Sequence, residues 1–107
     1  MTDAILMRVY MNESYKYEGR PLHEVVVERA SEFGLSGATV LRGVLGYGAN
    51  HHFHSDKILS LSNDLPLVVE IIDTEERLGA FAIMLQDIMD QGLVTTEKIR
   101  AMWPGRI

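Results

Sequence analysis

The sequence contains no cysteine and fewer basic than acidic residues, and each shortage excludes a class of function. Without a thiol, the chain can form no disulfide, hold no cysteine-ligated zinc and offer no cysteine nucleophile. The 10 lysines and arginines stand against 15 aspartates and glutamates, which gives a formal net charge of −5 at pH 7. Because a nucleic-acid binder needs a basic face to neutralise phosphates, this balance argues against nucleic acid as a partner.

Long apolar runs and catalytic motifs are missing as well. No stretch approaches the roughly 20 apolar residues of a membrane helix, and Arg8 interrupts the apolar start AILMRVYM. We therefore expect no signal peptide and a cytoplasmic protein that is not membrane-inserted. Neither the G-x-S-x-G nor the H-E-x-x-H pattern occurs, so we expect no enzymatic activity. With 107 residues, the chain is expected to form a single domain over residues 1–107.

Strand and helix patterns alternate along the chain. Branched and long apolar residues predict strands over residues 4–11, 38–47, 65–73 and 97–103. Apolar residues at helical spacing predict one helix over 21–33, ended by Gly34, and a second that Asp73 caps and that ends before Gly92. This βαββαβ order predicts an α+β fold, a ferredoxin-like sandwich. Its antiparallel sheet has the order 4-1-3-2, with two helices on one face.

The residues on the two sheet faces predict contacts between subunits. One face is wholly apolar and should lie under the helices: Ile5, Met7, Val9, Leu41, Leu45, Leu67, Val69, Ile71, Ile99 and Ala101. The other face mixes large apolar residues with ionic ones: Arg8, Arg42, Glu70, Lys98 and Arg100. A homo-oligomer that covers this face explains the mixture, and an exposed sheet with scattered apolar residues is the alternative. Glu70, the only acid assigned to this face, is expected to pair with Arg8 or Arg42.

The stretch GVLGYGANHHFH, residues 43–54, allows several interpretations. The Gly46-Tyr47-Gly48 turn would let a phosphate approach backbone N–H groups, or it is only a tight bend. His51, His52 and His54 could hold a metal ion, because imidazole is a common metal ligand. They lack helical spacing, however, and a solvated loop is the alternative.

The segments KYEGRPLHEVVVERASEFGLSGATVLRG, GVLGYGANHHFHSDKILSLSNDLPLVVEIID and GLVTTEKI resemble the DUF190 family, within the PII-like superfamily of trimeric signalling proteins. The resemblance spans residues 6–102. It implies a homotrimer of ferredoxin-like subunits with a small-molecule cleft between neighbours. The ligand implied is phosphate-bearing, with an adenine nucleotide favoured, although no cofactor is certain. A protein partner, such as a membrane transporter, is implied for the loop over residues 49–63.

The resemblance also places the ligand-binding residues. The turn over residues 46–50 and the loop over residues 92–98 should face each other across the cleft. The residues implied are Gly46, Tyr47, Gly48, Asn50, Gly92, Thr95, Thr96 and Lys98. Thr95 and Thr96 stand where the PII phosphate loop has an Asp-Gly pair, and Ala49 replaces a PII arginine. The trimeric CutA-type proteins, linked with metal tolerance, support the alternative of a metal site at His51, His52 and His54.

Overall fold

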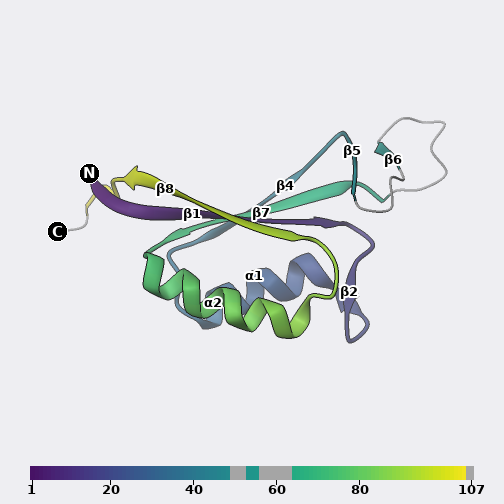
Figure 1. The fold of residues 1–107 in the computed structure, drawn as a ribbon, viewed down its shortest axis with the longest axis horizontal. Helices are drawn as coiled ribbons and strands as arrows, with labels where there is room; N and C mark the ends of the chain where they lie inside the picture. Colours follow the sequence, from purple (N-terminus) through teal and green to yellow (C-terminus); the bar gives the residue numbers. More distant parts are fainter. Residues whose placement is uncertain (49–52, 56–63, 106–107) are drawn as a thin grey trace.

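A computed structural model describes residues 1–48, 53–55 and 64–105 of the chain (Figure 1). Its elements are β1 (Thr2–Asn12), β2 (Lys16–Tyr17), β3 (Arg20–Pro21), α1 (Leu22–Glu32), β4 (Ala38–Arg42), β5 (Leu45–Tyr47), β6 (Phe53–Ser55), β7 (Pro66–Asp73), α2 (Glu75–Ile88) and β8 (Leu93–Ala101). The main sheet has the order β4-β7-β1-β8, with antiparallel neighbours throughout. These are the four predicted strands in the predicted order, read from the other edge.

Both helices lie on the same side of this sheet, as predicted (Figure 1). The core forms between the helices and the sheet, because every second side chain of β1 and β7 points toward the helices. Met7, Val69 and Ile71 are fully buried on this side. The helices contribute residues at spacings of three and four, which form one stripe on each helix: Leu22, Val25, Val26 and Ala30 from α1, and Leu78, Phe81, Leu85 and Ile88 from α2. The apolar pattern thus specifies which face of the sheet the helices cover.

The ends of the helices fit the predictions with one correction. Helix α1 ends at Glu32, and the N–H of Gly34 donates to the carbonyl of Ser31. The N-cap of α2 is Thr74, whose hydroxyl accepts a hydrogen bond from the backbone N–H of Arg77, and not Asp73 as predicted. Asp73 is buried instead, and its carboxylate accepts from the backbone N–H groups of Ser36 and Thr74. Through these two hydrogen bonds, the Asp73 carboxylate links the turn after α1 to the start of α2.

The two outer strands differ from the predictions in extent. Strand β8 begins at Leu93 and not at residue 97, so most of the predicted loop over residues 92–98 is part of the strand. The predicted second strand is interrupted: β4 ends at Arg42, and β5 forms a separate two-stranded sheet with β6.

The faces of the outer strands are also the reverse of those predicted. Val40 lies opposite the buried Val69, so Val40 and not Leu41 points toward the helices. On β8, Lys98 lies opposite the buried Ile5, while Ile99 belongs to the open face. The prediction failed here because a shift of one residue reverses every side chain of a strand. No residue of β4 or β8 is fully buried, so their apolar patterns identify the core face poorly.

The turn from α2 into β8 depends on Gly92, which adopts a φ of 104°. A Cβ at this position would lie 2.5 Å from the backbone oxygen of Tyr10 and 2.9 Å from Cε of Met89. The turn therefore requires the absence of a side chain as well as a backbone conformation that favours glycine.

Gly92→Ala is therefore expected to destabilise the protein by about 1–3 kcal/mol, the cost typical of a strained backbone conformation. Gly79→Ala is the matched control, because Gly79 lies exposed in α2 and a Cβ there meets nothing within 4 Å. That change should stabilise the helix by about 0.5–1 kcal/mol. Urea unfolding followed by circular dichroism measures both, and equal midpoints for the two variants would contradict this account of the turn.

Candidate functional site

A hollow of about 460 Å³ lies beside the turn at Gly92. Met89, Leu93 and Val94 supply its accessible apolar surface, and Gln86, Asp90, Gln91 and Thr96 supply hydrogen-bonding groups. Such a lining suits a flat, hydrogen-bonding organic group. No lysine or arginine lines this hollow in the described part of the chain. A phosphate bound here would depend on backbone N–H groups or on a cation from elsewhere.

Three predicted ligand-binding residues after Gly92, namely Thr95, Thr96 and Lys98, do not converge within the chain. Thr95 lies opposite Arg8 on the open face, whereas Thr96 lies opposite the buried Met7 on the helix side. Lys98 is six residues beyond Gly92, or about 20 Å along an extended strand. It lines a second hollow, of about 480 Å³, with Asp3, Glu75 and Arg100. The separation follows from β8 being a strand where a compact phosphate loop was expected.

The glycine-rich turn belongs to the opposite edge of the molecule. Gly46 and Tyr47 lie in β5, opposite His54 and Phe53 of β6, and Gly48 follows β5. The Tyr47 side chain is 59% exposed. Asn50, His51 and His52 lie outside the described residues, and of His54 only the backbone position is described. No group of three His, Asp or Glu residues that could hold a metal occurs among the residues that the structure describes.

The two predicted halves of the ligand site nevertheless share one end of the sheet. Pro66 of β7 pairs with Asn12, and Leu93 of β8 pairs with Tyr10, so the Gly92 turn and the start of β7 flank the same end of β1. The backbone N–H of Gly43, just before β5, donates to the carbonyl of Pro66 at 2.7 Å. The strands β4 and β8 are opposite edges of the sheet, three strand spacings or about 14 Å apart. The fold of the chain therefore holds the two halves apart.

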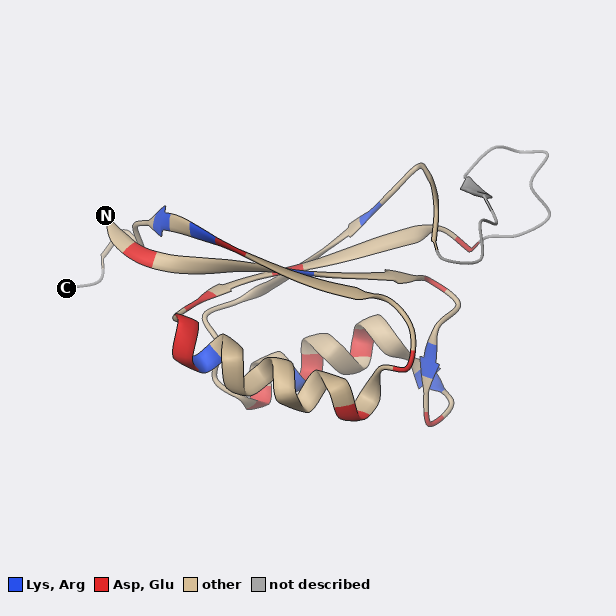
Figure 2. Ribbon diagram, in the orientation of Figure 1, with Lys and Arg blue, Asp and Glu red and all other residues tan. Residues whose placement is uncertain are grey.

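The open face of the sheet carries an ion-pair network around Arg8. Its Nε lies 3.0 Å from Oε2 of Glu70, which confirms one predicted pair. A terminal nitrogen of Arg8 lies 2.6 Å from Oε1 of Glu97. Figure 2 shows these basic and acidic segments of β1, β7 and β8 together in the middle of the sheet. Hydrogen bonds from Arg8 to Glu70 and then to Glu97 raise the pKa of the guanidinium above its ordinary value, so Arg8 stays positively charged.

The rest of the predicted charge pattern is wrong. Arg42 pairs with Glu13 and not with Glu70, because Arg42 lies opposite Leu67 and points to the other side of the sheet. Thr39 is the residue of β4 opposite Glu70. Glu97 is a second acid on the open face. It lies within the predicted strand over residues 97–103, but the faces of that strand are the reverse of those predicted, so Glu97 was not assigned to the open face.

Large apolar side chains surround this network and are exposed in the single chain. Tyr10, Leu41 and Leu93 lie on the open face, and Val44 and Leu45 lie where the chain leaves β4. Leu93 is 58% exposed and Val44 is 67% exposed. Exposed apolar side chains that extend over neighbouring strands are typical of protein contact surfaces.

Comparison with solved structures defines the class of fold as PII-like. The chain is similar to CPII from Thiomonas intermedia, solved with ADP and bicarbonate, with a TM-score of 0.66 and 15% identity over 95% of this chain and 91% of that one. A putative PII-like signalling protein from Thermus thermophilus gives a TM-score of 0.67 and 19% identity, over 92% of this chain and 88% of the other.

The family follows from the sequence comparison. The DUF190 family model (Uncharacterized ACR) matches residues 4–101, and the chain belongs to this family. A UPF0166 protein of Aquifex aeolicus is 39% identical over 100 residues, 92% of each chain. A UPF0166 protein of Methanocaldococcus jannaschii is 32% identical over 95 residues, 88% of this chain and 87% of the other. Within the described residues, no helix is both long and apolar enough to cross a membrane.

Proposed function

We infer that this protein is a non-enzymatic PII-like regulator that binds an adenine nucleotide between the subunits of a homotrimer. The observation that carries the proposal is the shared fold: CPII has this architecture over nearly the full length of both chains and was solved with ADP, and in another structure with ADP and AMP. Membership in the DUF190 family is consistent with this function.

A cyclic assembly would bring together the glycine-rich turn and the turn at Gly92, which a single chain holds apart. In a closed ring, every subunit presents one edge to the neighbour on one side and its other edge to the neighbour on the other side. Gly46, Tyr47 and Gly48 beside β4 would then lie next to Gly92 and to Thr95 and Thr96 of β8 in the next subunit. The nucleotide base would lie in the hollow beside Gly92, which combines apolar and hydrogen-bonding groups. Asn50 and Lys98 are the remaining residues of the proposed set, and Lys98 lies farther along β8, at the second hollow. In this arrangement the open sheet face is covered by neighbouring subunits.

The segment over residues 49–63 is proposed to contact a protein partner, such as a membrane transporter, in the cytoplasm. The segment follows directly on Gly48, a residue of the proposed nucleotide site, so the sequence itself links the partner segment to that site. A metal site at His51, His52 and His54 remains the alternative function, and the binding experiments below separate the two.

Thr96→Val is expected to weaken ADP binding about fivefold, because the loss of one hydrogen-bonding hydroxyl costs about 1 kcal/mol. Thr2→Val is the control, since Thr2 is exposed at the far end of β1. Isothermal titration calorimetry with ADP measures both. Unchanged binding by the Thr96 variant would remove the hollow beside Gly92 from the nucleotide site.

Lys98→Ala should weaken ADP binding more than tenfold and more than His51→Ala does, if Lys98 contacts a phosphate with a charge-assisted hydrogen bond. If ADP binding is weakened by Lys98→Ala but not by Thr96→Val, the nucleotide site would instead be assigned to the hollow beside Asp3 and Glu75. Tight binding of a divalent metal by the wild type, abolished by His51→Ala, with no response to ADP, would support the metal alternative instead.

Glu70→Gln tests whether neighbouring subunits cover the open face. In a covered face the change leaves Arg8 with one carboxylate partner fewer away from water, so the unfolding midpoint should fall several times further than in Glu76→Gln. Glu76 is the control because it is exposed in the first turn of α2. Denaturant unfolding at fixed protein concentration compares the two, and equal midpoints would contradict a covered face, since exposed ion pairs contribute little.

A further inference from the structure

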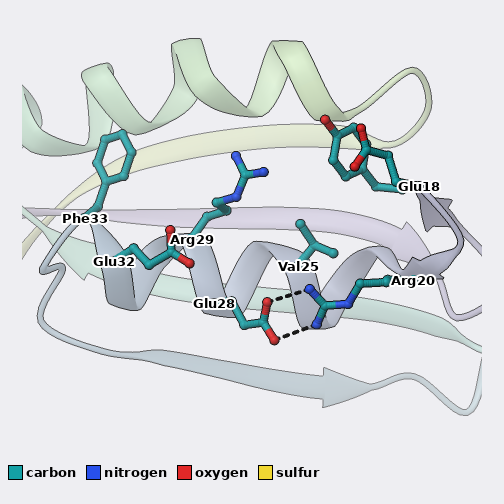
Figure 3. Close-up of a pocket in the computed structure, with 8 residues that line it drawn as sticks. Glu18, Arg20, Val25, Glu28, Arg29, Glu32 and Phe33 are labelled. Atoms are coloured by element: carbon teal, nitrogen blue, oxygen red, sulfur yellow. Dashed lines mark hydrogen bonds and ion pairs between the residues drawn. The ribbon is translucent and has the colours of Figure 1, made fainter.

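A groove on the helix side of the molecule lies between α1 and the β2–β3 hairpin (Figure 3). Its volume is about 510 Å³, within the range of about 300–1,000 Å³ that is typical of small-molecule sites. The hairpin turn consists of Glu18 and Gly19, with φ values of 49° and 79°, as in the tight turns that match the twist of a β-hairpin. The groove lies on the face opposite the open sheet, so a trimer formed through that sheet leaves it accessible.

One arginine of the groove is neutralised within the protein. The two terminal nitrogens of Arg20 donate to the two carboxylate oxygens of Glu28, at 2.8 and 2.6 Å. This two-point contact raises the pKa of Arg20 and lowers the pKa of Glu28, so both stay ionised at neutral pH. Because Arg20 and Glu28 already form charge-assisted hydrogen bonds with each other, they line the groove without requiring a ligand to balance their charges.

The other charges of the groove have no such partner. Arg29 lies with its guanidinium carbon 6.0 Å from the ring centre of Tyr17 and donates to the sulfur of Met84 at 3.6 Å, a weak acceptor. Arg29 lies near enough to Glu28 to contribute to the lowered pKa of that carboxyl, after the larger effect of Arg20, but it forms no ion pair with any carboxylate that the structure describes. Glu18 and Glu32 likewise form no ion pair with a described basic group. Figure 3 shows Glu18 and Glu32 toward opposite ends of the groove, with Arg29 between them.

We propose that this groove binds a free amino acid with a cationic side chain. One unpaired guanidinium and two unpaired carboxylates are complementary to a molecule with one carboxylate and two ammonium groups. The ligand carboxylate would accept hydrogen bonds from Arg29, whose planar donors suit a carboxylate. Its ammonium groups would donate to Glu18 and Glu32, and its methylene chain would lie against Val25 and the Tyr17 ring. This site is independent of the nucleotide site.

Calorimetric titration with L-lysine is the experiment. Norleucine has the same carbon chain without the second ammonium group, and 1,5-diaminopentane has both ammonium groups without the carboxylate. Lysine should bind at least ten times more tightly than either. No heat with lysine at millimolar concentration, or norleucine binding equal to that of lysine, would overturn the proposal.

Variants of the lining residues locate the site. Glu32→Gln and Arg29→Gln should each weaken lysine binding at least fivefold, and Glu76→Gln in α2 should leave it unchanged. Arg29→Gln also removes the contact with Met84, which could alter the packing of the helices. Glu32→Gln changes an exposed side chain, so it tests the site without that effect. ADP binding and circular dichroism serve as controls, so the loss of one site is distinguishable from unfolding and from failure of the nucleotide proposal. If Glu32→Gln leaves lysine binding unchanged, lysine binds elsewhere on the protein, and the assignment of the site to this groove is wrong.

Discussion

The register of β1 between β7 and β8 determines where the proposed binding residues of β8 lie. It places Arg8 opposite Glu70 on one side and Thr95 on the other, which brings Glu97 within reach of the same guanidinium. It also carries Thr96 to the helix side and Lys98 to the far end of the strand. A register shifted by one residue would bury the charges and expose the core, so the apolar residues of β1 and β7 indirectly position the functional groups.

This arrangement separates the molecule into three surfaces with different chemistry. Core residues fill the helix side of the sheet. A ligand can therefore bind on this side only at its edges, near the Gly92 turn or near Glu75. The open sheet face combines an ionic network with exposed apolar side chains, a composition that suits a protein partner more than water. The outer helix layer has unpaired charges around Arg29. Assembly, nucleotide binding and the proposed amino-acid site can therefore coexist without competing for the same residues.

The sequence predicts the strand order and both helices because β1, β7 and the helices are buried on one side, where the apolar period is strict. It does not predict the faces of β4 and β8, which are exposed edges with few constraints on their pattern. Thr74 takes the cap because Asp73 is already engaged with Ser36, a contact between segments far apart in the sequence. The candidate site was predicted by resemblance. Its described residues do not meet within one chain, because β4 and β8 are opposite edges of the sheet and most of the expected loop over residues 92–98 is a strand.

The central claim is that the nucleotide site exists only where the edges of two subunits meet. Sedimentation velocity, with detection of ADP and of protein in the same run, tests it most directly. The account predicts that ADP sediments with a species of three times the chain mass of 12.0 kDa, and not with free subunits. ADP that sediments with a species of 12.0 kDa, or a protein that remains a monomer at micromolar concentration, would contradict it.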